Sequence, residues 1–514
     1  MKPFKNNFIL KFCAVVLFGT LTTGCKTKET TPKAPQSPNI IYVLADDLGY
    51  GDLSCYNPDS KIKTPNLDKL ASEGMRFTDA HTSSSVCTPT RYGLLTGRYN
   101  WRSTLKRGVV YGDSPALMDS SRTTVAKLLK NKGYNTAFIG KWHLGWDWAK
   151  DESGNIDFSK PIGNAPNAYG FNYAYGHCGS LDMPPYVYVE NGMPTAIPTD
   201  TTENTDYQAM WRKGPTAPDF VHEAVTPNFF ERSFNYIKSH AKDDKPFFLY
   251  LPLPSPHTPI LPTENWKDKS GLNPYADFVM MVDYYMGLLE KTIKEQGIDN
   301  NTLIVFTSDN GCSPRADYKT LTAKGHNPSY IYRGTKADIF EGGHRVPFIV
   351  KWPNTVKKGT TCNQTICLTD FMATCANITN AELADNEAED SFSMFPIFEN
   401  PNTEAYKREA TVHHSINGSF AIRKGDWKLA LCPDSGGWSY PNPSKDTVTT
   451  PPFQLYNIKN DPSETTNLFN DHPQIVAELK TLLTQYVNNG RSTPGMPQKN
   501  DGEAKWEQLS WMDK

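Results

Sequence analysis

The chain has 514 residues, which is long for one compact unit, so we expect about two or three structural units. Its 53 lysines and arginines nearly balance its 55 aspartates and glutamates, and the formal net charge is -2. This balance argues against a globally basic nucleic-acid-binding surface and against a disordered acidic tail, so no nucleic-acid partner is predicted.

Residues 1–24 are predicted to be a targeting signal. A basic start precedes an apolar stretch from Phe8 to Leu21, which is too short to span a membrane comfortably. The ending Leu21-Thr22-Thr23-Gly24-Cys25 resembles a bacterial lipobox, which implies cleavage before Cys25 and a lipid anchor on its thiol. An ordinary secretory signal is the alternative. Residues 25–38 are predicted to be a flexible tether. No acidic run follows Cys25, so we expect an envelope protein that faces the periplasm.

The first predicted strand, residues 39–45, is a β-branched apolar run that ends at Asp46-Asp47. Sheets of α/β proteins bind ligands at the carboxyl ends of their strands, where these carboxylates stand. Adjacent like charges repel unless a cation neutralises them, and hard oxygen donors suit Ca²⁺ or Mg²⁺. The alternative is a solvated turn or a helix cap.

A Ser/Thr-rich loop with a cysteine at its centre follows a predicted helix (64–74) and strand (74–80). Pro89 is expected to stiffen the loop and to keep Thr88 out of the helical region, so that a helix starts near Arg91. Cys87 beside the permanent cation of Arg91 is suited to bind or attack an anion. The alternative is a small buried cysteine and a surface arginine.

Basic side chains follow two more predicted strands. The strand over residues 134–140 leads to Lys141 and His143, a compact cation and a proton carrier on one side of an extended segment. The strand over residues 246–251 leads to His257, which neighbouring prolines hold on a rigid loop. For Lys141 and His143 the alternative is an exposed lysine and a histidine at the edge of the core.

Residues 151–225 are rich in Gly, Pro, Asn and Tyr and lack clear periodicity, so we predict long loops or an insertion there. His177, Asp182 and His222 lie in this region. They are candidates for contacts with ligand hydroxyl groups, although an ordinary loop role fits each of them equally well.

The strand predicted over residues 301–308 ends at Asp309-Asn310, a second pair of oxygen donors that could complete a divalent-cation site with the first pair. Lys336, further along, is another candidate cation for an oxyanion. Beyond about residue 400 short strands alternate with turns, which predicts an antiparallel sheet. We therefore predict a catalytic domain over residues 39–400 and a C-terminal subdomain over residues 401–514.

The ten cysteines do not predict a fully paired disulfide framework. Setting aside one in the signal, one for lipid and Cys87 leaves an odd number. One pair among Cys362, Cys367 and Cys375 could form a disulfide in an oxidising envelope, whereas the lack of a nearby histidine makes a zinc site a poor explanation.

Taken together, the motifs resemble the type I sulfatases over nearly the whole mature chain and occur in that family's order. They are Asp46-Asp47, Cys87-Thr88-Pro89-Thr90-Arg91, Gly140-Lys141-Trp142-His143-Leu144-Gly145, Pro256-His257-Thr258-Pro259, Ser308-Asp309-Asn310-Gly311 and Gly334-Thr335-Lys336. The resemblance implies an α/β fold of the alkaline phosphatase type, with a large mixed sheet between helices and a smaller C-terminal antiparallel-sheet α+β subdomain.

The resemblance also implies that a maturation enzyme oxidises Cys87 to formylglycine, whose aldehyde hydrate attacks sulfur and forms a covalent sulfo-enzyme. The resemblance further implies that Asp46, Asp47, Asp309 and Asn310 bind Ca²⁺ and that modified Cys87 completes the set of ligands.

The other matched residues take roles around the transferring group. Arg91 would hold the hydrate, and Lys141, His257 and Lys336 would bind the sulfate oxygens. His257, with or without Lys336, would protonate the leaving alcohol, and His143 would deprotonate the remaining hydroxyl so that sulfate is expelled.

The segment from Cys87 to Arg102 resembles the branch that contains N-acetylgalactosamine-6-sulfatases and galactose-6-sulfatases. We therefore predict removal of 6-O-sulfate from these sugars in mucin or glycosaminoglycan fragments, with His177 and His222 contacting hydroxyl groups. One alternative is a phosphate or phosphonate ester hydrolase of the same superfamily. Another is a non-catalytic lipoprotein that binds sulfated glycans, which would not need Cys87 together with the lysines and histidines.

Overall fold

The structure is a computed structural model in which residue 1 and residues 37–448 and 450–513 are described. The targeting signal predicted for residues 1–24, most of the tether and the lipid attachment at Cys25 fall outside these residues. No helix in the described part is both long and apolar enough to cross a membrane. Contacts group Ser37–Lys514 into one compact unit, and the boundary near residue 400 stays a prediction.

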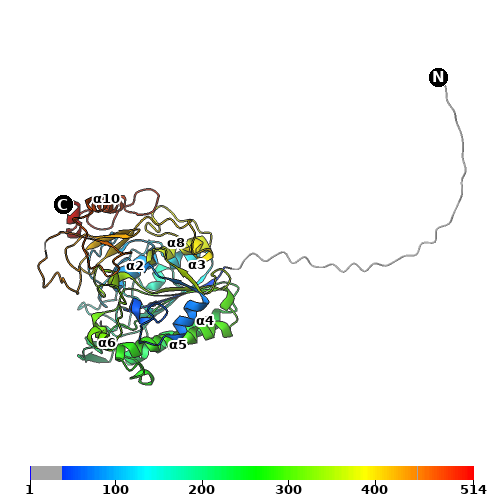
Figure 1. Cartoon of the computed structure of the whole chain (residues 1–514). Helices are drawn as coiled ribbons and strands as arrows, with labels where there is room; N and C mark the ends of the chain where they lie inside the picture. The colour runs from blue at the N-terminus through cyan, green and yellow to red at the C-terminus, as the bar shows by residue number, and fades with distance from the viewer. Residues whose placement is uncertain (2–36, 449, 514) are drawn as a thin grey trace. The chain divides into compact units, whose positions relative to one another are not determined.

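A mixed sheet of ten strands forms the centre of this unit (Figure 1). Its strand order is β13 (Thr360–Cys362), β2 (Met75–Phe77), β12 (Phe348–Lys351), β11 (Thr302–Ser308), β1 (Asn39–Ala45), β10 (Phe247–Pro252), β4 (Asn135–Lys141), β5 (Tyr173–His177), β6 (Val189–Glu190) and β7 (Met193–Pro194). The five strands from β11 to β5 are parallel, so their carboxyl ends share one edge. The prediction that residues 39–45 form a buried parallel strand is confirmed.

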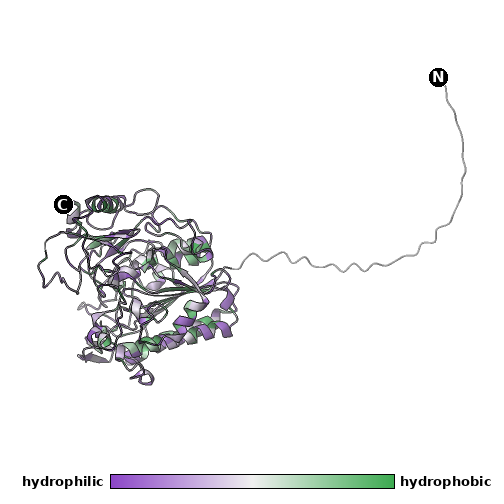
Figure 2. Ribbon diagram, viewed as in Figure 1, coloured by the Kyte–Doolittle hydropathy of each residue, from purple (hydrophilic) through white to green (hydrophobic). Residues whose placement is uncertain are grey.

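Strand β1 alternates its side chains between two helix layers. Ile40, Tyr42 and Leu44 face one apolar cluster, whereas Ile41 and Val43 face the other. The first layer contains α2 (Cys87–Thr96), α3 (Val125–Asn131) and α8 (Phe371–Ile378). The second contains α1 (Pro65–Glu73), α4 (Val225–His240) and α5 (Pro274–Glu295). Figure 2 shows that these helices carry both apolar and hydrophilic residues, as expected for helices with one buried face.

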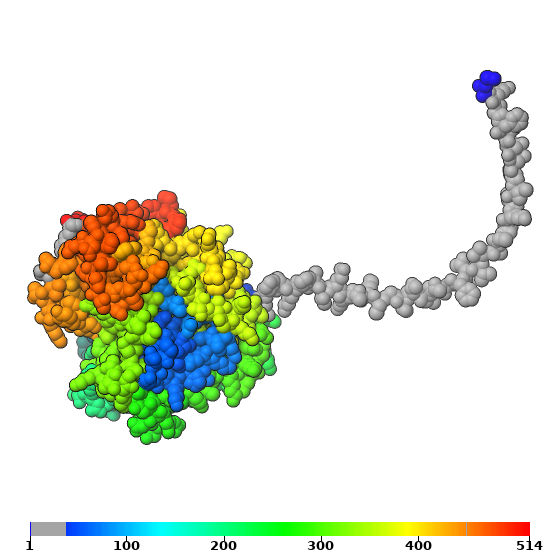
Figure 3. All heavy atoms as spheres, in the orientation of Figure 1, coloured from blue at the N-terminus to red at the C-terminus, as the bar shows by residue number. Residues whose placement is uncertain are grey.

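A second, antiparallel sheet follows the main one in the chain and confirms the change of pattern seen beyond residue 400. It contains β15 (Thr411–His414), β16 (Phe420–Lys424), β17 (Trp427–Ala430) and β18 (Gln454–Asn457). Helix α10 (Pro473–Asn489) covers one face, with Leu479 and Leu483 packed near Ile422 and Leu429. In Figure 3 the orange and red C-terminal residues pack directly against the yellow and green residues before them.

Smaller elements complete the described part. They are β3 (Ala80–His81), β8 (Asp200–Asn204), β9 (Trp211–Thr216), β14 (Ile366–Cys367), α6 (Tyr318–Ala323), α7 (Glu341–His344) and α9 (Phe395–Glu399). The region 151–225 is therefore more regular than predicted, because it contributes β5 to the main sheet and the β8–β9 pair. Strand β5, Tyr-Ala-Tyr-Gly-His, was not predicted, because its two tyrosines favour a strand but it contains no β-branched residue.

Two local predictions were wrong. Helix α2 begins at Cys87 rather than near Arg91, and Thr88 is helical despite the following proline. Pro89 lies in the first turn, where a helix does not need its missing N–H group. The three neighbouring cysteines Cys362, Cys367 and Cys375 are all free, so the disulfide considered among them is not formed.

Candidate active site

Two neighbouring strand ends bring four oxygen-bearing side chains together. Ala45 of β1 pairs with Ser308 of β11, so Asp46-Asp47 and Asp309-Asn310 leave the sheet side by side. The Asp309 N–H donates to the Ala45 carbonyl at 3.0 Å, and the Asp47 N–H lies 3.3 Å from Asp309 Oδ1. All four side chains are buried.

Three cations surround these carboxylates. The Arg91 guanidinium lies 3.1 Å from Asp46 Oδ2 and 2.7 Å from Asp309 Oδ2. The Lys141 ammonium also pairs with Asp46, and Lys336 Nζ lies 2.6 Å from Asp47 Oδ1. Each buried charge therefore has an opposite partner, as burial requires.

The carboxylates nevertheless differ in their pKa values. Burial opposes ionisation of Asp46, but Lys141 and the other cations outweigh it and hold its pKa well below the ordinary value. For Asp309, burial followed by repulsion from Asp46 raises the pKa to about 6. Burial likewise raises the pKa of Asp47. The protein's own cations thus outweigh the effect of burial only at Asp46, and a bound positive charge would lower the pKa values of Asp47 and Asp309.

The donor set fits a hard divalent cation. Asp47 Oδ2 and Asn310 Oδ1 are buried oxygens without a hydrogen-bond partner, although nearly all such atoms in proteins have one. Asp47 has a φ of +65°, a left-handed conformation that non-glycine residues seldom adopt and that often marks a functional position. Ligand atoms of Asp46, Asp47, Cys87 and His257 all lie within 4.8 Å of one another. Carboxylate and amide oxygens of this kind suit Ca²⁺.

Cys87 is buried at the first position of α2, and its Sγ lies 3.5 Å from Asp46 Oδ1. Burial, followed by the negative charge of Asp46, raises the pKa of the thiol above its usual range. An unmodified Cys87 is therefore a poor source of the reactive thiolate. Backbone bonds fix its loop: the Ser85 N–H donates to the His414 carbonyl at 2.9 Å, and the Ala337 N–H donates to the Ser85 carbonyl at 2.9 Å.

The two predicted proton carriers, His143 and His257, differ in their hydrogen-bond partners. His143 is buried with a φ of +57°; its Nε2 lies 3.0 Å from the Val110 carbonyl, and its Nδ1 has no partner. His257 places Nδ1 2.5 Å from the Thr258 carbonyl and Nε2 3.6 Å from Asp47 Oδ2. Burial and then the Lys336 cation lower the pKa of His257 to about 3, and burial and then Lys141 lower that of His143 well below its usual range. Both environments therefore disfavour the protonated imidazolium.

A cavity of about 430 Å³ opens above His257 and Lys336, within the size range of ligand pockets, roughly 300–1,000 Å³. Its wall includes Asp182, a residue predicted from the sequence, together with residues that carry no sequence signal. These are Tyr207, Arg212, Arg315 and Trp438. They come from three separate parts of the chain, around residues 207–212, 315 and 438, and belong to no motif, so only the fold brings them together.

His177 and His222 occupy a different environment. His177 is fully buried beside the Phe220 ring, with ring centroids 5.1 Å apart, and His222 stacks on Trp211 at 4.1 Å. Neither lines the cavity, although the Nε2 atom of each has no hydrogen-bond partner. Their contacts with substrate hydroxyl groups stay predictions.

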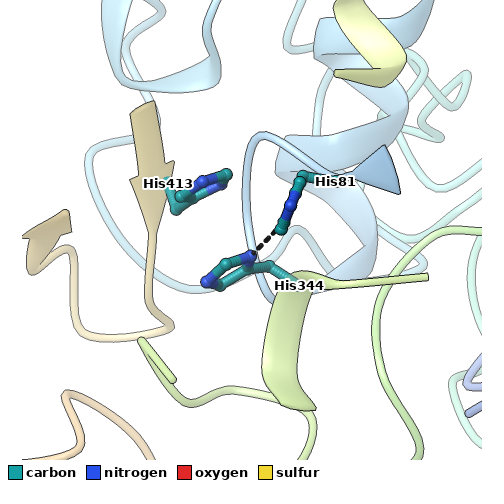
Figure 4. A group of neighbouring side chains, drawn as sticks. All are labelled: His81, His344 and His413. Carbon is teal, nitrogen blue, oxygen red and sulfur yellow. Dashed lines mark hydrogen bonds between the residues drawn. The ribbon is translucent and has the colours of Figure 1, made fainter. Parts of the chain in front are cut away.

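A second group of possible ligands, the three-histidine cluster, consists of His81, His344 and His413 (Figure 4). Nδ1 atoms of His81 and His344 lie 3.0 Å apart, and the rings of His344 and His413 stack at 3.8 Å with 8° between their planes. His81 Nε2 lies 2.8 Å from Asp79, and Lys428 Nζ lies 2.9 Å from His344 Nε2. One choice of tautomers gives a continuous hydrogen-bond chain from Lys428 through His344 and His81 to Asp79.

This cluster supports the Cys87 loop rather than forming an evident metal centre. The stacked rings of His344 and His413 lie in two parallel planes, so one ion cannot lie in the plane of both. His413 Nδ1 lies 3.0 Å from the Thr82 carbonyl, and the Thr82 N–H donates to the His344 carbonyl at 2.8 Å. Sequence patterns do not predict the cluster, because its members are far apart in the chain.

Comparison with known proteins shows which families and proteins this chain resembles. The sulfatase family profile matches residues 38–381, and the C-terminal profile of N-sulphoglucosamine sulphohydrolase matches residues 335–489. An N-acetylgalactosamine-6-O-sulfatase of Bacteroides thetaiotaomicron is 33% identical over 90% of this chain and 96% of its own. Human arylsulfatase A is 31% identical over 87% of both chains.

A solved structure from work on the metabolism of multiple glycosaminoglycans by Bacteroides thetaiotaomicron superimposes with a TM-score of 0.77 at 32% identity. The match covers 88% of this chain and 99% of the other. The predicted fold, a mixed sheet between helices with a small C-terminal antiparallel sheet in the alkaline phosphatase-like arrangement, is confirmed.

Proposed function

The chain belongs to the sulfatase family, a family of sulfuric ester hydrolases, and on this premise we propose that it removes 6-O-sulfate from galactose or N-acetylgalactosamine. The substrates would be mucin or glycosaminoglycan fragments. The similarity to an N-acetylgalactosamine-6-O-sulfatase supports this choice of sugar. The observation that carries the proposed chemistry is the meeting of Cys87, a carboxylate cluster with unpartnered oxygens and three cations at one edge of the sheet.

In this proposal Asp46, Asp47, Asp309 and Asn310 hold Ca²⁺, and Cys87 is the precursor of formylglycine. A bound calcium ion would supply Lewis-acid polarisation of the sulfate oxygens, and the hydrated aldehyde would supply the nucleophile. The raised thiol pKa supports a modified side chain, because the thiol itself is a poor nucleophile here. A maturation enzyme is then a required partner.

The cations of the site balance the charge of the transferring group. Arg91 is held rigidly, since it donates to Asp46, to Asp309 and to the Lys141 carbonyl at 2.9 Å. This fixed guanidinium would orient the nucleophile beside it. Lys141 and Lys336 each keep N–H groups that could donate to sulfate oxygens, where negative charge is concentrated in the transition state.

The hydrogen bonds of the two histidines suggest opposite proton roles. With Nε2–H of His143 donating to the Val110 carbonyl, its buried Nδ1 carries a free lone pair and can act as a base. With Nδ1–H of His257 donating to the Thr258 carbonyl, its Nε2 lies 3.6 Å from Asp47 Oδ2, and the residue lines the cavity. A negatively charged ester next to His257 would raise the pKa of that imidazole and favour the protonated form that a leaving alcohol needs.

A comparison of substrates with different leaving groups tests the role of His257. His257→Gln should lower kcat for a sugar sulfate by about 10²–10⁴-fold, the usual value of acid catalysis. The loss should be much smaller for an aryl sulfate with an acidic phenol, because that leaving group needs no proton. Equal losses on the two esters would refute this assignment.

Substrate panels test the wider proposal. The enzyme should cleave 6-O-sulfated galactose or N-acetylgalactosamine faster than other sulfated sugars, and an aryl sulfate faster than the matching aryl phosphate. Cleavage of another sulfated sugar with no action on galactosides or chondroitin fragments would contradict the proposed sugar. A faster reaction with the phosphate would favour the phosphate or phosphonate hydrolase.

We also propose that Cys25 carries a lipid that anchors the enzyme in the envelope, facing the periplasm. The lipobox-like sequence supports this location. Cys25→Ala should move the enzyme from the membrane fraction to the soluble fraction in the native host. Full retention in membranes would contradict lipid attachment at this residue.

A further inference from the structure

The cavity above the candidate active site carries more positive charge than one sulfate ester needs. Three cationic side chains and one carboxylate lie on its wall. Lys336 lies beside Asp47 near the proposed sulfate position, and Arg212 is paired with Asp182, with Nη1 2.5 Å from Oδ2. Arg315 forms no ion pair with any carboxylate in the described ranges. Arg315 is therefore the cation on this wall that has no carboxylate partner among the described residues.

Arg315 is held in place without using most of its hydrogen-bonding capacity. It lies in a 3-10 turn, Pro314–Ala316, and its N–H donates to Ser313 Oγ at 3.2 Å. Its guanidinium stacks over Tyr207 at 4.7 Å, and Nη1 donates to the Tyr207 carbonyl at 3.0 Å. Most of its five N–H groups stay available, so the fork is positioned before any ligand arrives.

The surroundings of Arg315 tie it to the catalytic residues. The turn follows Asp309-Asn310 directly through Gly311, Cys312 and Ser313, and the Lys336 N–H donates to the Cys312 carbonyl at 2.9 Å. The side chain is thus fixed relative to the proposed sulfate position. Trp438, which is 45% exposed, adds an apolar surface to the same wall against which a sugar ring can pack.

We propose that Arg315 forms a subsite for a second anionic group on the substrate, either another sulfate on the same sugar or the carboxylate of a neighbouring uronic acid. A planar guanidinium binds either group through paired N–H···O bonds. The inference rests on the proposed sulfatase function and narrows its substrate. It favours multiply charged glycosaminoglycan fragments over singly sulfated mucin sugars.

The preference of the enzyme for doubly charged over singly charged substrates tests this proposal. We would measure kcat/KM for 6-O-sulfated N-acetylgalactosamine, for its 4,6-disulfated form and for a disaccharide that adds a uronate. Arg315→Gln should lower the ratio of the doubly charged to the singly charged substrate by about tenfold or more, as expected for one charge-assisted contact. Arg315→Lys should restore part of the ratio. The matched control Arg107→Gln, whose side chain is 69% exposed and pairs only loosely with Glu507, should keep the wild-type ratio.

The two doubly charged probes distinguish the source of the anion, because only the one that reaches Arg315 should respond to the variant. An unchanged ratio for both probes in Arg315→Gln would overturn the subsite. If the wild type cleaves none of the three sugars, the proposed function fails instead. Calorimetric affinities of the same sugars for Cys87→Ser, alone and with Arg315→Gln, would then decide the subsite by the same ratio.

Discussion

The strand-end cluster (Asp46, Asp47, Cys87, His257, Asp309 and Asn310) and the three-histidine cluster both gather possible metal ligands. Both are buried apart from His257, which is partly exposed, and both bring three or more possible metal ligands within 4.8 Å of one another. They differ in how their polar atoms are used. In the histidine cluster the rings continue a chain of hydrogen bonds from Lys428 to Asp79, whereas the strand-end cluster leaves oxygens of Asp47 and Asn310 without partners.

This difference indicates that the strand-end cluster is a ligand-binding site and that the three-histidine cluster is a structural support. A buried oxygen without a partner costs free energy, and a left-handed aspartate adds strain, so the strand-end cluster is incomplete by itself. The histidine cluster leaves only His413 Nε2 without a partner and ties that residue to the loop through Thr82. Proximity of ligand atoms therefore says less about metal binding than the balance of their hydrogen bonds does.

The largest expected effect belongs to the nucleophile position. Cys87→Ser should lower kcat/KM for an aryl sulfate by more than about 10⁴-fold, in line with the loss of other covalent nucleophiles, while the melting temperature stays close to that of the wild type. Mass spectrometry of the Cys87 peptide from a native host should detect formylglycine. An unmodified thiol in active, natively expressed enzyme would contradict the proposed nucleophile.

The stabilisation of the protein by Ca²⁺ should depend on the strand-end cluster and not on the three-histidine cluster. Saturating Ca²⁺ should stabilise the wild type by about 3 kcal/mol at a hundred times its dissociation constant, raising the melting temperature by several degrees. Asp47→Asn removes a ligand charge and should abolish most of this shift and most of the activity. His413→Asn should keep the full calcium shift, and loss of the shift in this variant would show that the clusters do not act separately.

A smaller effect should appear in the pH dependence of stability. Burial, followed by the charge of His81, lowers the pKa of His413 well below its usual value. Unfolded imidazoles titrate near 6.5, so below that pH His413 binds a proton in the unfolded chain but not in the folded one, and its contribution to the free energy of unfolding falls as the pH falls. His413→Asn should reduce this slope by up to about 1.4 kcal/mol per pH unit.

Denaturant unfolding of both proteins at pH 7 and pH 5.5 would measure the slopes. Burial raises the pKa of Glu464 to about 7, and this works in the opposite direction in both proteins, so the difference between their slopes is the informative quantity. Identical slopes would mean that His413 is already protonated in the folded protein.

Much of the fold could be predicted from the sequence, because buried parallel strands leave a strong signal. Strand β1 has the predicted bounds, β10 is shifted by one residue at each end, and β11 begins one residue later than predicted. The polar residues that follow these strands already indicate Asp46, Asp309 and His257 as site residues. Strand β5 was missed, since its burial comes from Tyr and Ala in a glycine-rich context rather than from a β-branched run.

The details of the site were less accessible to sequence reasoning. The left-handed backbone conformations of Asp47 and His143 could not be predicted from local sequence, because only the surrounding packing imposes them. Pairing of Lys141 with Asp46 depends on the alignment of β4 with its neighbours, which local patterns do not encode. Arg315 and Trp438 meet at the cavity only through long-range contacts, so no motif could have joined them.

The bonds that fix the Cys87 loop also govern when the site can exist. Ser84 Oγ and the Ser85 N–H both donate to the carbonyl of His414, more than 300 residues later in the chain. During synthesis this carbonyl emerges only after about four fifths of the chain has been made, and contacts of such sequence separation are slow to form. The loop is therefore secured only after residue 414 has been made, so a protein truncated before that residue should lack activity even where its central sheet assembles.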